Sequence, residues 1–180
     1  RLCQSGPSRV CSLLELEQLQ QELSGIRFLA TVGGDGTILQ AVRVTAPLEV
    51  PLVGVNLGRV GFMAELSAEQ ALEGICSYLQ EDIWLEKRSM LQARVLSSQA
   101  TPPVAHGLND AVVGRAQVAR LVHLEVSIDG DPLFTYAGDG AIIATATGST
   151  GYSLSAGGPI LYPESPSLIV KPVAPQLSLN

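Results

Sequence analysis

The stretch that decides the fold is LATVGGDGTILQ, residues 29–40. An apolar run ends at Val32, and Gly33, Gly34 and Gly36 then surround a single carboxylate. A glycine-rich turn between a buried strand and a helix lets backbone N–H groups approach an anion with no side chain in the way. The stretch therefore predicts a phosphate-binding turn that leads from a strand into a helix.

Asp35 carries the one charge inside this turn. A carboxylate there repels phosphate unless it has another task, such as accepting the proton of an attacking hydroxyl group or holding a magnesium ion. A positioned base raises the reaction rate by a factor of about 10² to 10⁴, and this gain in catalysis can outweigh the cost of the repulsion. The alternative is that Asp35 only caps the following helix, with its carboxylate accepting from backbone N–H groups near Ile38. The spacing after Gly36 does not fit the dinucleotide fingerprint G-x-G-x-x-G.

Alternating helix and strand signals surround this turn. Ser12 and Glu15 predict a capping box, and Gly25 stands where that helix would end. The expected elements are a helix with an apolar face from Leu13 to Leu23, a strand at 26–32, a helix at 37–44 ended by Pro47, a strand at 51–56, and a helix capped by Ser67 and Gln70. This alternation predicts an α/β N-terminal domain, in which helices cover a parallel sheet.

The pattern changes beyond residue 84. Apolar and polar residues alternate at 91–95 and at 122–128, which predicts half-buried strands, and Asp129-Gly130 is a strong hairpin signal. A further strand is expected at 141–147, running into a second glycine-rich loop. We therefore expect a mostly antiparallel, β-rich C-terminal domain that is incomplete, with domains at 1–83 and 84–180.

The last expected strand, SLIVKPVA at 167–174, lies close to the end of the chain. An antiparallel sandwich does not close comfortably on so few strands, and an exposed strand edge is an aggregation liability. The sequence thus indicates a chain that is cut short. A partner chain, missing residues or an unusual gene product would account for the unpaired strand edge.

Composition narrows the class of protein. The chain has 180 residues, 46% of them hydrophobic and 16% charged, and no apolar run reaches the roughly 18 residues of a membrane span. A net charge of -6 without basic blocks argues against nucleic acid as a partner. We expect a cytoplasmic protein that binds no membrane. Cys3, Cys11 and Cys76 lack the spacing of a zinc or redox motif, so we expect reduced thiols without a chemical role. No residue is assigned as a metal ligand.

The second glycine-rich segment is TATGSTGYSLSAGGPIL, residues 145–161. It concentrates short hydroxyl side chains and glycines around one aromatic residue, Tyr152. Such a surface suits a sugar, a phosphate and a flat base. The alternative is an ordinary Ser/Gly loop.

Together these motifs resemble the NAD kinases, which transfer a phosphoryl group to the 2′-hydroxyl of the adenosine ribose of NAD. The resemblance is carried by Gly33–Thr37 and by GVNLGRVGFMAEL (54–66), RSML (88–91), LNDAVVGR (108–115), DGAIIATATGSTGYSLSAGGPIL (139–161) and VKPVAPQLS (170–178). It spans most of the chain and implies an α/β domain and a β-rich domain with the active site between them.

Residue by residue, the resemblance implies that Asp35 accepts the proton of the 2′-hydroxyl. Gly33, Gly34, Thr37 and Arg59 would face the phosphate donor. The positions implied to bind the dinucleotide are Gly36, Asn109, Asp110, Arg120, Asp139, Thr150, Gly151, Tyr152, Ser153, Leu154 and Ser155. Asn56 and Phe62 would shape the site. The chain departs from the family pattern at Asp110, where Glu is usual, and at Ala146, Gly151 and Gln176, where Pro, Ala and His are usual.

The implied donor is ATP or inorganic polyphosphate with Mg²⁺, and the acceptor is NAD or NADH. A homodimer or homotetramer is expected. Two alternatives stay open: a lipid or sugar kinase that shares the Gly-Gly-Asp-Gly-Thr turn, and a non-catalytic NAD-binding fragment.

Overall fold

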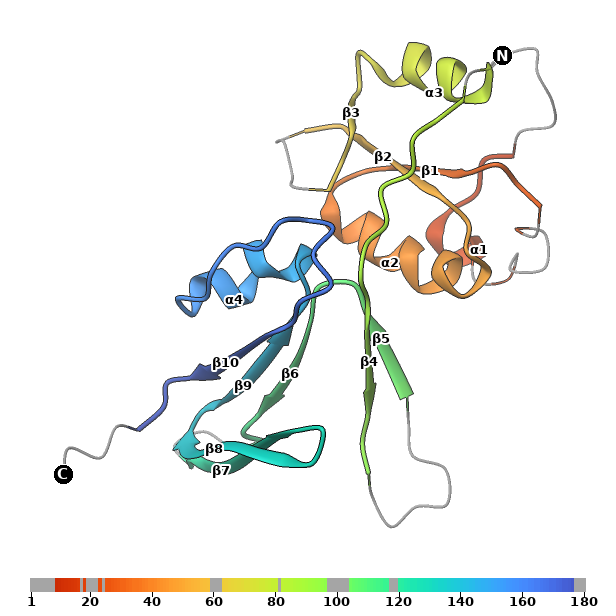
Figure 1. Ribbon diagram of the computed structural model, residues 1–180. Helices are drawn as coiled ribbons and strands as arrows, with labels where there is room; N and C mark the ends of the chain where they lie inside the picture. The colour runs from red at the N-terminus through yellow and green to blue at the C-terminus, as the bar shows by residue number, and fades with distance from the viewer. Residues whose placement is uncertain are drawn as a thin grey trace. The chain divides into compact units, whose positions relative to one another are not determined.

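The computed structural model describes residues 9–16, 18, 23, 25–58, 63–80, 82–96, 104–116 and 120–176 (Figure 1). Contacts within the chain divide it into two units, Arg1–Glu86 and Lys87–Asn180. The domain boundary between residues 83 and 84 stays a prediction.

The described strands of the first unit form a parallel sheet of three strands in the order β1-β2-β3. The strands are β1 (Leu29–Val32), β2 (Leu52–Asn56) and β3 (Leu66–Ser67). Val32 pairs with Val55, and Asn56 pairs with Ser67. The carboxyl ends of the three strands therefore share one edge of the sheet, and the predicted parallel sheet is confirmed.

The helices described in this unit include α1 (Leu13–Leu16), α2 (Asp35–Thr45) and α3 (Ala71–Gln80), with the short 3₁₀ helix η2 (Ala46–Leu48) directly after α2 (Figure 1). Ala41 and Val44 of α2 form a buried cluster with Leu16 and Leu23, and Leu29 and Leu52 pack against it. Burying this apolar face is what holds α2 on the sheet.

Both predicted capping boxes are present. The backbone N–H and the hydroxyl of Ser12 donate to Glu15 Oε2 at 2.7 and 2.9 Å, and the N–H of Glu15 donates to Ser12 Oγ at 3.3 Å. The Ser67 and Gln70 side chains each accept from the other residue's N–H, at 3.4 and 3.3 Å. Gly25 has a φ of +85°, as expected of a glycine after a helix.

Several predicted boundaries are wrong. The strand predicted from residue 26 begins at Leu29, because Ile26 packs against the core without a strand partner. The helix predicted from residue 37 begins two residues earlier, at Asp35. Of the first predicted helix, residues 17, 19–22 and 24 lie outside the described residues.

The described residues of the second unit form three antiparallel sheets. Its strands are β4 (Leu91–Arg94), β5 (Val104–Gly107), β6 (Asp110–Gly114), β7 (Val122–Ile128), β8 (Asp131–Gly138), β9 (Gly140–Ala144) and β10 (Ile169–Val173). They form the pairs β4-β5 and β7-β8 and the sheet β10-β9-β6. The predicted antiparallel architecture is confirmed.

The predicted hairpin turn joins β7 to β8. Asp129 and Gly130 have φ values of +53° and +92°. Two consecutive positive φ angles are what a two-residue hairpin turn requires, and aspartate and glycine tolerate them. The turn residues therefore account for the pairing of Ile128 with Asp131.

The second glycine-rich segment is not an open loop. It forms the 3₁₀ helix η3 (Thr147–Thr150) and the short helix α4 (Tyr152–Ser155), next to β9 and β10 (Figure 1). Ile142, Ala144 and Ile169 make the core of this sheet, and Ala156 and Leu161 pack against it. In the sheet of described strands β10 is an edge strand, as predicted.

Cys76 is disulfide-bonded, so the prediction of reduced thiols is wrong for this residue. Cys11 is a free thiol, and Cys3 lies outside the described residues. Within the described ranges, the helices are all too short or too polar to span a lipid bilayer.

Candidate active site

The first candidate group is the turn between β1 and α2. Gly33 has a φ of +155°, and its N–H donates to the Val55 carbonyl at 2.9 Å. A Cβ atom at this position would overlap the hydroxyl oxygen of Thr37. Only glycine satisfies both constraints, so Gly33 sets the path of the chain into the helix.

Gly34 is the N-cap residue of α2, and Asp35 is the first residue of the helix. Asp35 therefore lies one position after the N-cap residue, and the alternative that its carboxylate only caps the helix stays a prediction. The N–H groups of Thr37 and Ile38 point back to the Gly34 carbonyl, at 2.9 and 3.5 Å. A Cβ built at Gly34 or Gly36 would meet no described atom within 4 Å, so a ligand can approach the backbone closely here.

Asp35 is partly buried at the N-terminus of an eleven-residue helix. The positive end of the helix dipole favours negative charge at this position. The same field favours an incoming phosphate, so the turn can hold a carboxylate and a phosphate near each other.

Asn56 lies at the same edge of the sheet as Gly33, since Val32 pairs with Val55. Its side-chain oxygen accepts from the Gly58 N–H at 2.9 Å, which shapes the chain after β2. Gly54 lets α2 approach β2, because a Cβ there would lie 2.7 Å from Cδ1 of Ile38. Arg59 and Phe62 lie outside the described residues.

The second candidate group joins Asn109 to the segment around η3. The N–H of Thr145 donates to the Asn109 carbonyl at 2.9 Å. A Cβ at Gly148 would overlap the Asn109 carbonyl oxygen, so η3 lies directly against this backbone. The Asn109 side-chain nitrogen lies 4.0 Å from where a Cβ of Gly151 would stand. Asn109, Asp110 and the start of α4 are thus brought together.

Two buried polar atoms in this group have no hydrogen-bond partner in the described part of the chain. They are Oδ1 of Asn109 and Oγ of Ser153. Ser153 is fully buried, whereas Tyr152 and Leu154 are 48% and 40% exposed. The ring of Tyr152 is therefore accessible to a ligand, and the Ser153 hydroxyl faces the interior.

Most of the hydroxyl groups that we expected on a ligand surface bond within the protein. Ser149 donates to the Ala146 carbonyl at 2.6 Å and accepts from the Leu161 N–H at 3.0 Å. Thr150 donates to the Thr147 carbonyl at 3.3 Å, and Ser155 to the Gly151 carbonyl at 3.5 Å. These bonds satisfy the backbone of two very short helices.

Asp110 begins β6 and is partly buried. Burial removes water from its carboxyl group and raises its pKa above the ordinary value of 3.8. Nearby, Nη1 of Arg88 donates to the Thr147 hydroxyl at 3.3 Å, which ties the RSML segment to η3.

Asp139 and Arg120 are not part of this group. Asp110 pairs with Ala144 at one end of β9, whereas Asp139 precedes the other end and lies about 17 Å away along the chain direction. Asp139 forms an ion pair of 3.2 Å with Arg115. Arg120 is exposed and lies two residues before β7, whose first residue pairs with Gly138. Asp139 and the start of β7 therefore lie at the end of β9 that is away from Asp110.

Thr145 supports this group of residues, and the sequence pattern did not identify it. Thr145 is fully buried, and its hydroxyl bonds to Leu108 and Gly148. The signal in the sequence is a threonine at the end of an apolar run, inside the strand predicted at 141–147.

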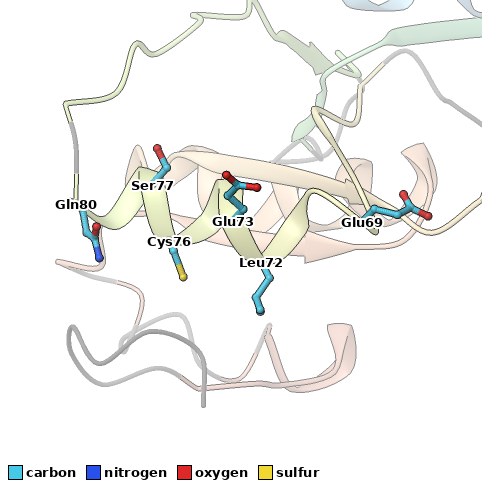
Figure 2. A pocket seen from close by; sticks show the side chains of 6 residues that line it. All are labelled: Glu69, Leu72, Glu73, Cys76, Ser77 and Gln80. Carbon is cyan, nitrogen blue, oxygen red and sulfur yellow. The ribbon is translucent and has the colours of Figure 1, made fainter.

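A surface hollow runs along α3 (Figure 2). It is lined by Glu69, Leu72, Glu73, Cys76, Ser77 and Gln80. None of the candidate residues lines it, and it is open to solvent, so it is not the candidate site.

The described residues contain no group of three His, Cys, Asp or Glu side chains able to hold a metal ion. Mg²⁺ commonly binds through one or two carboxylates together with substrate phosphates. Asp35 is the one carboxylate in the glycine turn, so the donor set fits a magnesium ion that is held mainly by a polyphosphate.

The fold and the site define a protein in which an α/β unit and an antiparallel β unit each carry one glycine-rich segment. Residues 6–83 match the ATP-NAD kinase N-terminal domain, and residues 108–180 match the ATP-NAD kinase C-terminal domain. The chain belongs to the NAD kinase family.

Curated relatives carry the name NAD kinase. One from Dehalococcoides mccartyi is 46% identical over 167 residues, which is 92% of this chain and 59% of the relative. One from Carboxydothermus hydrogenoformans is 39% identical over 165 residues, which is 92% of this chain and 59% of that relative. The chain thus spans 59% of the length of these two relatives.

Solved structures of NAD and NADH kinases are also similar. A yeast NADH kinase complexed with NADH has a TM-score of 0.80 and 32% identity, over 89% of this chain and 48% of that one. An NAD kinase from Archaeoglobus fulgidus in complex with ATP has a TM-score of 0.67 and 32% identity, over 88% of this chain and 59% of that one.

Proposed function

We propose that this protein phosphorylates the 2′-hydroxyl of the adenosine ribose of NAD, using ATP, to form NADP. The hydroxyl oxygen forms a bond to the γ-phosphorus of ATP, the bond to the bridging oxygen breaks, and ADP leaves. The carboxylate of Asp35 accepts the hydroxyl proton. The observation that carries the proposal is the position of Asp35 as the first residue of α2, in a turn that Gly33 shapes and Gly34 and Gly36 leave open.

The donor phosphates would lie against the backbone of Gly33, Gly34 and Thr37, at the N-terminus of α2. Arg59 would add a positive charge there. Mg²⁺, carried on the donor, would neutralise charge that develops as the phosphoryl group moves. Inorganic polyphosphate is an alternative donor because it offers the same phosphate chain.

The dinucleotide would be held by Asn109, Asp110 and the segment Thr150–Ser155, with Gly36 beside the nucleotide. In support, Oδ1 of Asn109 is buried and without a described hydrogen-bond partner, so it can accept from a ribose hydroxyl. The half-exposed ring of Tyr152 offers a surface for a flat base. Asp139 and Arg120 would contact a more distant part of the ligand.

The relatives support this choice of substrates. One solved relative was complexed with NADH and another with ATP, and we extend both ligand classes to this chain. We further propose that the protein works in the cytoplasm as a homodimer or homotetramer.

The test is an assay of NADP formation from NAD and magnesium ATP by the purified chain. Radiolabelled ATP with NAD, NADH, diacylglycerol and sphingosine in parallel reactions identifies the acceptor. Label in NADP or NADPH supports the proposal. Label in either lipid contradicts it, and NAD binding without any product supports a non-catalytic binding role instead.

A further inference from the structure

Thr145 lies between β9 and η3, and its side chain is fully buried. Its hydroxyl donates to the Leu108 carbonyl at 2.6 Å and lies 3.2 Å from the Asn109 carbonyl oxygen. The same oxygen accepts from the Gly148 N–H at 3.1 Å. One hydroxyl group therefore joins the Leu108–Asn109 turn to the first residues of η3.

The chemistry of these bonds requires a hydroxyl. A hydroxyl group donates one hydrogen bond and accepts others, so it can serve a carbonyl and an N–H at once. Leu108 and Gly148 are both buried, so water does not replace a lost hydrogen-bond partner of their backbone groups. Valine has the same shape as threonine but would leave both groups unsatisfied.

The Thr145 backbone supports the same turn. Its N–H donates to the Asn109 carbonyl at 2.9 Å, and the preceding residue, Ala144, pairs with Asp110. These bonds hold the Asn109 backbone, from which the side chain that carries Oδ1 extends. A binding group is effective when the residues behind it fix its geometry before the ligand arrives.

We propose that Thr145 is a positioning residue, which holds Asn109 and Asp110 against the η3–α4 segment and thereby sets the affinity for the dinucleotide. The inference rests on the proposed function, because that function assigns the dinucleotide to these residues. Thr145 does not itself touch the ligand in this account.

The experiment compares Thr145→Val and Thr145→Ser with a matched control, Thr45→Val. Thr45 is a buried threonine of α2 whose hydroxyl donates to the Ala41 carbonyl at 3.1 Å, in the other unit. The dissociation constant for NAD is measured by calorimetry, and kcat and KM for NAD are measured by NADP formation. Exchange of the Gly148 amide hydrogen is followed by NMR.

We expect Thr145→Val to weaken NAD binding about tenfold, equivalent to about 1.4 kcal/mol. KM should rise with it, while kcat at saturating NAD changes less than about threefold. Exchange at Gly148 should accelerate. Thr145→Ser keeps the hydroxyl and should bind NAD within about twofold of the wild type, as should Thr45→Val.

Unchanged NAD affinity in Thr145→Val, or an equal loss in Thr45→Val, overturns the inference. A wild type that binds no NAD also overturns it. A wild type that binds NAD but forms no NADP contradicts the proposed function, and the dissociation constants then decide the inference alone. If Thr145→Val does not fold, Thr145→Cys replaces it, because a thiol forms only weak hydrogen bonds. An NAD affinity of Thr145→Cys equal to that of the wild type would then contradict the positioning role of Thr145.

Discussion

Gly148 lies so close to Asn109 that a Cβ atom at position 148 would overlap the Asn109 carbonyl oxygen. The same Cβ would lie 2.8 Å from Cα of Asn109, so backbone rather than a movable side chain blocks it. We expect Gly148→Ala to lower the free energy of unfolding by about 2 kcal/mol, as overpacking does. Urea unfolding measures the change.

The matched control is Gly114→Ala, on β6 of the same unit. A Cβ there would meet only the Asp139 carbonyl oxygen, at 3.6 Å, among the described atoms. This variant should change stability by less than about 1 kcal/mol. An equal loss in both variants would show that close packing at Gly148 is not the cause.

Gly33 gives a second test, in the first unit. Gly33→Ala forces a side chain into a positive φ and into the Thr37 hydroxyl, and should cost about 1–3 kcal/mol of unfolding free energy. Gly36→Ala places its Cβ in open space and favours the helix, so stability should hold or rise. Thermal unfolding of both variants makes the comparison, and a Gly33→Ala protein as stable as the wild type contradicts the assigned backbone constraint.

The Asp110 carboxyl group predicts a pH dependence of stability. Its pKa is raised in the folded state by burial, so the folded protein holds this proton more tightly than the unfolded chain. The protonated carboxyl group stabilises the folded state fully at pH values below the pKa of Asp110 in the unfolded chain. This stabilisation is lost as the pH rises through the pKa of Asp110 in the folded protein. Asp110→Asn should therefore be more stable than the wild type at pH 7, with the difference shrinking as the pH falls toward 3.8. Urea unfolding across this range measures it, and a difference independent of pH would contradict the burial argument.

Variants of the ion pair between Asp139 and Arg115 distinguish an effect on stability from an effect on NAD binding. Both side chains are 33% exposed, so Asp139→Asn and Arg115→Gln should each change stability by less than about 1 kcal/mol. If Asp139 contacts the dinucleotide, only Asp139→Asn should also weaken NAD binding, by about tenfold or 1.4 kcal/mol. Calorimetry decides. Equal weakening in both variants would assign the effect to the ion pair rather than to the carboxylate.

Local structural features were predicted well from the sequence. The capping box of Ser12 with Glu15 and the hairpin turn at Asp129-Gly130 depend on residues at most three apart, so their geometry is encoded locally. The parallel and antiparallel sheets followed from the period of the apolar residues. The glycine turn was located correctly, although α2 begins at Asp35 and not at Thr37.

The second glycine-rich segment was harder to predict. Its serines and threonines indicated a ligand surface, yet Ser149 and Ser153 are fully buried. Composition cannot tell a hydroxyl that faces a ligand from one that satisfies backbone of η3 and α4. The role of Thr145 was missed for the same reason, because its partner Leu108 lies 37 residues away in the sequence. Long-range hydrogen bonds of this kind leave no local pattern.

The most direct test of the central claim is the turnover of Asp35→Asn, compared with Asp82→Asn, which alters an exposed carboxylate of the same unit. Asparagine cannot accept the proton of the 2′-hydroxyl as a carboxylate does, so kcat for NADP formation should fall by about 10² or more while NAD affinity stays within about threefold. Asp82→Asn should match the wild type in both measurements. Turnover by Asp35→Asn equal to that of the wild type would show that another group removes the proton.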